Sequence, residues 1–125
     1  MDINWEGKRL VIAEDERVNY LFLKAALKRT NITIFWAQNG QEAIDFVEQQ
    51  GPIDIVLMDL KMPIMNGLEA THRIKKVFPN LPVIAQTAYA HSEYKDQIQE
   101  AGCDALLSKP IQADVLLNTI KEHLS

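Results

Sequence analysis

The chain has 125 residues, of which 47% are hydrophobic and 24% charged, a size and composition that fit one folded domain and exclude a disordered chain. Seventeen acidic and 13 basic residues give a formal net charge of −4, which argues against sequence-independent nucleic-acid binding, since that requires a basic surface. The single cysteine excludes an internal disulfide. We recognise no signal peptide or membrane-spanning apolar run, and expect a cytoplasmic domain that contacts neither nucleic acid nor membrane directly.

Five short apolar runs, most of them rich in β-branched residues, predict β-strands. They lie at residues 9–13, 32–37, 53–58, 81–85 and 105–107. The first, third and fourth are apolar on both faces, as expected for strands covered on both sides of a parallel sheet. The second and fifth are shorter or more mixed, which is typical of strands at a sheet edge.

Segments with the helical spacing of apolar residues lie between these runs and after the last one. The third of them, at about residues 67–78, is predicted to direct four apolar side chains inward, those of Leu68, Ile74, Val77 and Phe78. The fourth ends at Gly102, where glycine can adopt the left-handed conformation. Strict alternation of strand and helix predicts a single α/β domain of three layers, in which right-handed crossovers join parallel strands.

Polar residues follow the predicted strands, at the edge where parallel sheets bind ligands. They are Glu14-Asp15 after the first strand, Asp59 after the third, Thr87-Ala88 after the fourth and Lys109-Pro110 after the fifth. Converging carboxylates repel one another unless a cation joins them, and their hard oxygen atoms suit Mg²⁺ or Mn²⁺. Lys109 adds a compact positive charge and Thr87 a hydroxyl donor, so the set predicts a site for a phosphoryl group.

Taken singly, each of these residues has an ordinary structural explanation. Asp15 is a suitable N-cap for the next helix, and Asp59 is a typical turn residue ahead of Pro63. Thr87 suits a strand end, and Lys109 suits a solvated surface. Their shared position at one edge of the predicted sheet is what favours the site.

These motifs, with Lys61-Met62-Pro63 and Asn66-Gly67 after Asp59, resemble the receiver domain of response regulators in two-component signalling. The resemblance extends from Lys8 to about Leu124. It implies a flavodoxin-like (βα)5 sandwich with the strand order 2-1-3-4-5. It also implies a signalling phosphoacceptor rather than an enzyme, in which Asp59 receives a phosphoryl group from the phosphohistidine of a histidine kinase or histidine phosphotransfer domain.

The resemblance further assigns roles to the residues of the site. Asp15 and Asp59 hold the Mg²⁺ directly together with the backbone carbonyl of Lys61, whereas Glu14 acts chiefly through metal-bound water. Lys109 pairs with one phosphoryl oxygen, and Thr87 and the N–H of Ala88 bind another and draw their loop inward. In receivers a cis bond before Pro110 aims the lysine.

Several positions depart from the common receiver pattern or tune it. Many receivers carry Tyr or Phe where this chain has Leu106, which puts an aromatic switch there in doubt. Gln86 is polar where an apolar residue packs more simply. Lys61 and Tyr89 flank the mouth of the site, and by shielding it they are predicted to slow self-dephosphorylation. Trp36 is interpreted as a residue that packs against or covers a sheet edge.

The start of the chain, Asp2–Lys8, resembles the junction that joins a kinase ATPase domain to the C-terminal receiver of hybrid sensor histidine kinases. The runs Asn39-Gly40-Gln41-Glu42-Ala43 and Ala88-Tyr89-Ala90 are also similar to such receivers. Residues 1–7 are then a leader or linker remnant and residues 1–125 a single receiver domain. A stand-alone receiver would end at the same place and stays open as an alternative. A phosphorylation-dependent homodimer also stays open.

Two other functions would use a similar fold. Haloacid-dehalogenase-like phosphatases or phosphotransferases also form an aspartyl phosphate, but they carry a second aspartate where this chain has Lys61. A flavodoxin-like module that binds FMN needs a loop rich in Ser, Thr and Gly after the first strand. Here that loop begins Glu14-Asp15-Glu16, which would repel the FMN phosphate.

Overall fold

The computed structural model of the chain describes residues 3–88 and 92–124, with the side chains of residues 92–94 excepted. Its strands form one parallel sheet in the order β2-β1-β3-β4-β5, as the receiver resemblance implied. The strands are β1 (Arg9–Ala13), β2 (Thr33–Ala37), β3 (Ile55–Asp59), β4 (Val83–Thr87) and β5 (Ala105–Ser108). The helices are α1 (Arg17–Leu27), α2 (Gly40–Gln49), α3 (Gly67–Val77), α4 (Ser92–Ala101) and α5 (Ala113–His123), with a short 3-10 turn, η1 (Lys28–Thr30), after α1.

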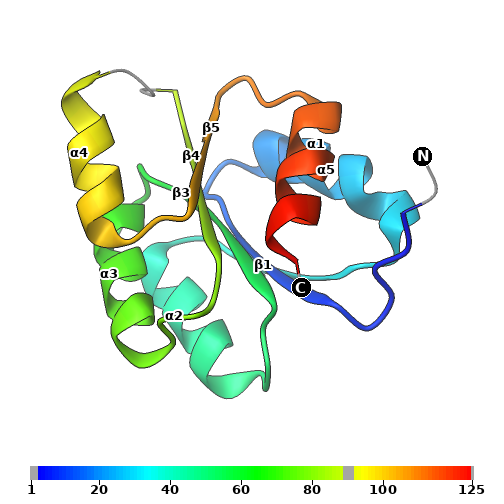
Figure 1. Cartoon of the computed structure of the whole chain (residues 1–125), viewed down its shortest axis with the longest axis horizontal. Helices are drawn as coiled ribbons and strands as arrows, with labels where there is room; N and C mark the ends of the chain where they lie inside the picture. Colours follow the sequence, from blue (N-terminus) through cyan, green and yellow to red (C-terminus); the bar gives the residue numbers. More distant parts are fainter. Residues whose placement is uncertain (1–2, 89–91, 125) are drawn as a thin grey trace.

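Helices cover both faces of the sheet and complete the three-layer sandwich (Figure 1). Helices α2, α3 and α4 lie on one side, and α1 and α5 lie on the other. All five residues of β3 and of β4 are buried, whereas β2 and β5, the edge strands, are only partly buried. The prediction of central and edge strands is therefore confirmed.

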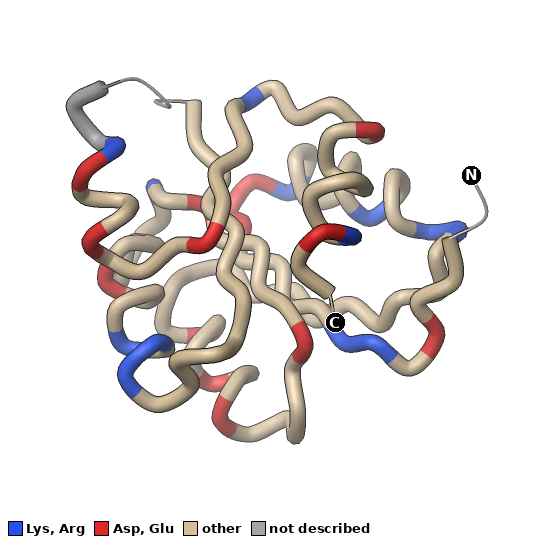
Figure 2. Tube along the Cα trace, viewed as in Figure 1, with Lys and Arg blue, Asp and Glu red and all other residues tan. Residues whose placement is uncertain are grey.

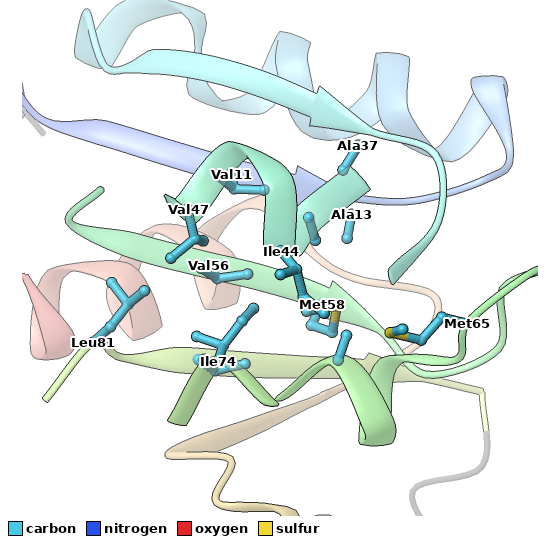
Figure 3. Close-up of a cluster of buried hydrophobic side chains, with 13 residues drawn as sticks. Val11, Ala13, Ala37, Ile44, Val47, Val56, Met58, Met65, Ile74 and Leu81 are labelled. Carbon is cyan, nitrogen blue, oxygen red and sulfur yellow. The ribbon is translucent and has the colours of Figure 1, made fainter. Parts of the chain in front are cut away.

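The larger apolar cluster lies between the sheet and helices α2 and α3 (Figure 3). Val11 and Val56 from the strands meet Ile44, Val47 and Ile74 from the helices. A second cluster on the other face joins Leu10, Ile12 and Leu57 with side chains of α1 and α5. Burial on both faces explains why the central strands have continuous apolar sequences rather than alternating ones.

Two details differ from the sequence prediction. Val77 and Phe78 do not point inward, since their side chains are 65% and 38% exposed. Helix α3 ends at Val77, and its last turn extends past the amino end of the sheet, where it lies beside residues that precede β3 and β4. Strands β3 and β4 each begin two residues later than predicted, at Ile55 and Val83. Before β4, Pro82 has no N–H to donate to the sheet.

Charged residues of both signs are distributed along the chain. Acidic and basic residues are interspersed along the trace (Figure 2). In the part of the chain that the structure describes, no helix has both the length and the apolar character needed to cross a bilayer.

Candidate functional site

The predicted site residues meet at the carboxyl ends of the strands, which together form one end of the sheet. Glu14 and Asp15 follow β1 directly, Asp59 is the last residue of β3 and Thr87 the last of β4. Lys109 follows β5 directly. The strands are parallel, so their carboxyl ends share this edge, and residues up to 95 positions apart in sequence come into contact.

Three carboxylates crowd together at this edge. Oxygen atoms of Glu14, Asp15 and Asp59 lie within 4.8 Å of one another. Glu14 is 0% exposed and Asp59 is 4% exposed, whereas Asp15 is exposed. Two buried negative charges so close together repel each other strongly, because little water is present to screen them.

Lys109 supplies the compensating charge within the protein. Its Nζ donates to Asp59 Oδ2 at 3.0 Å and to Glu14 Oε1 at 3.2 Å. The bond between Lys109 and Pro110 is cis. The backbone N–H of Lys109 also donates to the carbonyl of Thr87 at 2.8 Å, which ties the loop after β5 to the end of β4.

Burial and crowding change the acidity of these groups. Burial, reinforced by the neighbouring Asp59, raises the pKa of Glu14 from 4.5 to about 7, although Lys109 and the N–H of Glu16 partly oppose the rise. Burial alone would lower the pKa of Lys109. Its hydrogen bonds and charge interactions with Asp59 and Glu14 outweigh this effect, and the pKa of Lys109 ends above its ordinary value. Lys109 therefore stays cationic at neutral pH.

The loop after Asp59 is shaped by close backbone contacts. A Cβ at Gly67 would collide with the carbonyl oxygen of Asp59, so this position requires glycine. The N–H of Gly67 donates to the carbonyl of Leu60 at 3.0 Å, and Asn66 caps α3 by accepting from the N–H of Glu69 at 2.9 Å. The N–H of Lys61 donates to Asp59 Oδ1 at 3.3 Å. The Asn66-Gly67 motif thus returns the chain against the aspartate.

The residues expected to act as a switch or to tune the site differ in how deeply they are buried. Thr87 is 4% exposed at the end of β4, and Ala88 after it is exposed. Leu106 packs against the small apolar cluster that contains Leu60, Ala85 and Ile98. Tyr89 lies outside the described residues.

A cleft of about 510 Å³ opens beside the acidic group. It is lined by Asp15, Lys61, Asn66, Thr87 and Gln97 and by the apolar side chains of Leu60, Met62, Pro63 and Leu68. Two buried carboxylates, an exposed one and an adjacent opening form an oxygen-donor set of the kind that suits Mg²⁺. The residues present therefore fit a divalent cation.

Comparison with known proteins agrees with this geometry. Residues 10–121 match the family described as the response regulator receiver domain. The chain belongs to this family. It is 34% identical to the polar-differentiation response regulator DivK of Brucella anthropi over 119 residues, which cover 94% of this chain and 96% of DivK.

Solved receiver domains share the fold. The receiver domain of the sensor histidine kinase PA1611 from Pseudomonas aeruginosa, solved with magnesium in its active-site cleft, superposes with a TM-score of 0.86 at 27% identity, covering 94% of this chain and 97% of that one. The receiver domain of Saccharomyces cerevisiae Ssk1, solved with the histidine phosphotransfer protein Ypd1, gives a TM-score of 0.85 at 26% identity, covering 93% and 88%. The receiver domain described here is accordingly a signalling phosphoacceptor of two-component systems and not a classical enzyme.

Two residues of the receiver domain matter more to the site than the sequence indicated. Trp36 in β2 donates its indole N–H to the carbonyl oxygen of Glu14 at 2.7 Å. Gln86 is fully buried beside the site, and its Nε2 reaches the carbonyl of Ala13 at 3.5 Å, whereas its Oε1 has no hydrogen-bond partner among the residues that the structure describes. The polarity of Gln86 was visible in the sequence as a departure from the receiver pattern. No sequence signal links Trp36 to a particular carbonyl group.

Proposed function

We propose that Asp59 is the residue that receives the phosphoryl group, and that Asp15 and Asp59, with the backbone carbonyl of Lys61, hold Mg²⁺ or Mn²⁺ directly during the transfer, while Glu14 acts chiefly through metal-bound water. The observation that carries this proposal is the contact between the buried Asp59 carboxylate and Lys109 Nζ, 3.0 Å apart, inside the group of three carboxylates. Nucleophile, cation ligands and a fixed positive charge thereby meet at one point.

The transfer itself is a nucleophilic displacement at phosphorus. One Asp59 carboxylate oxygen attacks the phosphorus of a phosphohistidine: the new O–P bond forms, the P–N bond breaks, and its electron pair stays on the imidazole nitrogen. The ammonium of Lys109 already stands beside the reacting carboxylate, where it stabilises negative charge on the phosphoryl oxygens. A divalent cation bound to the carboxylates supplies further positive charge. Positioning and charge neutralisation are what this reaction requires.

Phosphorylation is then read out through the loop after β4. We propose that the hydroxyl of Thr87 and the N–H of Ala88 bind a phosphoryl oxygen and draw this loop toward Asp59. The hydrogen bond from the Lys109 N–H to the Thr87 carbonyl already connects the two loops that face the phosphoryl group. A local change of charge thus shifts the population between two surfaces of the domain.

A mass measurement tests the proposal. Incubation with Mg²⁺ and acetyl phosphate should add one phosphoryl group to the intact protein, and this gain should disappear in Asp59→Asn and in the presence of a chelator. Asp54→Asn is the matched control, because Asp54 lies at the amino end of the sheet, opposite the site. Its carboxylate accepts a hydrogen bond from the N–H of Arg9 at 2.8 Å. No gain in the wild type, or a gain that survives Asp59→Asn, would contradict the assignment.

The donor is proposed to be the phosphohistidine of a histidine kinase or histidine phosphotransfer domain. The fold shared with the yeast receiver solved with a phosphotransfer protein supports this. Transfer of labelled phosphoryl groups from purified candidate donors to the wild type, but not to Asp59→Asn, identifies the partner. A cytoplasmic setting and the lack of direct contact with nucleic acid or membrane stay predictions. Light scattering of the phosphorylated and unphosphorylated protein tests the homodimer.

We further propose that residues 1–125 form one receiver domain of the hybrid-kinase type, with residues 1–7 as the linker remnant. The similarity to the receiver of a sensor histidine kinase supports this setting, whereas the similarity to DivK favours the stand-alone alternative. The two are distinguished by finding whether the intact gene product carries a kinase ATPase domain ahead of residue 1.

The tuning residues yield a kinetic prediction. Lys61 lines the cleft beside Asp59, and we expect Lys61→Ala and Tyr89→Ala to shorten the lifetime of the phosphorylated protein severalfold by admitting water. Lys76→Ala, at an exposed position in the last turn of α3, is the control and should leave the lifetime unchanged. The lifetime is measured as loss of the added mass with time. An unchanged lifetime in both cleft variants would refute the shielding role.

A further inference from the structure

The main chain of Glu14 is held by the neighbouring edge strand. Strands β1 and β2 pair in parallel as far as Ala13 and Ala37, and the N–H of Glu14 adds one more bond by donating to the carbonyl of Ala37 at 2.9 Å. The chain then leaves the sheet toward Asn39, which caps α2. Strand β2 ends at Ala37, and none of the described residues after it gives a backbone N–H to the carbonyl of Glu14.

The side chain of Trp36 supplies the missing donor. Its Nε1–H donates to the carbonyl oxygen of Glu14 at 2.7 Å, so the hydrogen bonding between the strands continues for one step after the backbone pairing has ended. Both backbone groups of Glu14, the N–H and the carbonyl, are thereby bound to residues of β2. The loop that carries Glu14 and Asp15 begins from a fixed point.

Trp36 is in turn held by α1. The ring of Tyr20 stacks on the indole with a distance of 4.1 Å between ring centroids and an angle of 4° between the planes. Tyr20 is 8% exposed, and its N–H donates to the carbonyl of Glu16 at 3.0 Å. The acidic segment from Glu14 to Glu16 therefore has its first residue bound to Trp36 and its last bound to the residue that stacks on Trp36.

We propose that Trp36 is a positioning residue for the divalent-cation site, a role that rests on the proposed function of Glu14 and Asp15 in that site. Mg²⁺ demands near-ideal octahedral geometry, so its binding weakens when the Glu14-Asp15 dipeptide shifts, because Asp15 binds the ion directly and Glu14 acts through its bound water. Residues that orient the ligands of a metal ion contribute to its affinity although they do not touch it. The indole N–H acts in this way through the backbone of Glu14.

A purely structural role for Trp36 makes a different prediction. If the indole serves only to fill space and to stack on Tyr20, its loss lowers the stability of the fold without changing cation affinity. Trp36→Phe removes the N–H and retains an aromatic ring against Tyr20. Trp5→Phe is the matched control, because Trp5 packs against the same apolar cluster and has no contact with Glu14 among those observed in the described residues.

The test measures the Kd of Mg²⁺ by calorimetry and the unfolding midpoint in chelator for the wild type and both variants. We expect Trp36→Phe to raise the Kd about tenfold and Trp5→Phe to leave it unchanged. Phosphorylation by acetyl phosphate should need more Mg²⁺ in Trp36→Phe and should recover the wild-type rate at saturating Mg²⁺. A lower unfolding midpoint with an unchanged Kd would overturn the proposal.

A second variant isolates the hydrogen bond itself. The chain has two tryptophans, so in the Trp5→Phe background Trp36 is the only one and can be replaced biosynthetically by benzothienylalanine, which has sulfur in place of N–H. The same increase in Kd is expected, and an unchanged Kd refutes the proposal even if Trp36→Phe fails to fold. If the wild type binds no Mg²⁺, the proposed cation site fails instead, and a Kd that is raised equally by Trp5→Phe contradicts the specific role of Trp36.

Discussion

Carboxylates stand at both ends of the sheet, but their environments are opposite. At the amino end, Asp54 accepts from the N–H of Arg9 and Asp104 accepts from the N–H of Val83, both at 2.8 Å. Each aspartate precedes one strand and binds the first residue of the neighbouring strand. At the carboxyl end, oxygen atoms of Glu14, Asp15 and Asp59 lie close to one another instead.

The comparison separates carboxylates that stabilise the fold from those that serve the function. Asp104 accepts a hydrogen bond from a backbone N–H and forms an ion pair with Lys75, whose Nζ lies 2.7 Å from Oδ2. One negative charge is therefore balanced by one positive charge. Lys109 faces two buried carboxylates, so the carboxyl end keeps uncompensated negative charge. A folded protein retains such repulsion at a site that binds a cation and a phosphoryl group, because the ligand relieves it.

The largest expected difference concerns the two lysines that pair with these carboxylates. Lys109→Ala should lower the rate of phosphorylation by about 100-fold at saturating Mg²⁺, because a fixed charge beside the transferred group is lost. Lys75→Ala, its counterpart at the amino end, should leave the rate unchanged and cost about 1 kcal/mol of stability or less. Rates come from intact mass against time. Equal rate effects of the two substitutions would remove the distinction between the ends.

A pH dependence follows from the buried carboxylate of the carboxyl end. The pKa of Glu14 is about 7 in the folded protein, above its ordinary 4.5, so the folded state binds the proton more tightly than the unfolded state. Stability from this group is complete below about pH 4.5 and is lost as the pH rises through 7. Glu14→Gln should therefore be more stable than the wild type at pH 8 without Mg²⁺, by about 1–3 kcal/mol.

Urea unfolding in chelator at pH 5 to 8 measures this difference. Asp104→Asn is the matched change at the amino end and should be less stable than the wild type at every pH, by about 1–2 kcal/mol, because its charged hydrogen bonds are lost. Destabilisation of the same sign and size in both variants at pH 8 would show that the two ends do not differ.

The smallest expected effect concerns Gln86, the buried polar residue beside the site. Within the described part of the chain its Oε1 lacks a partner, so Gln86→Met, which has a similar shape, should raise the free energy of unfolding by about 1 kcal/mol. Met58→Leu is the control, because Met58 lies in the apolar cluster on the α2 and α3 side of the sheet, and this change should be neutral or slightly destabilising. Chemical unfolding of both variants tests this, and a loss of stability in Gln86→Met would indicate that its amide is needed.

Much of this arrangement was predictable. The five apolar runs appear as strands, and the residues after them form the carboxyl-end site, because short-range apolar patterns reflect burial in this sandwich. The prediction failed for Val77 and Phe78, whose spacing matched the buried face of α3 but which lie past the amino end of the sheet. The periodicity of apolar residues indicates which face of a helix is buried, but it does not indicate where the strands packed against that helix begin or end.

The sequence by itself determined the alternation of strand and helix and the chemical types of residue at each strand end. Only the tertiary structure decided that Glu14 is fully buried while Asp15 beside it is exposed, and that Lys109 bonds to both Glu14 and Asp59. It also decided that the indole of Trp36 holds the carbonyl of Glu14. These contacts join separate strands, so they depend on distances that the packing of the whole sheet sets and that no local pattern contains.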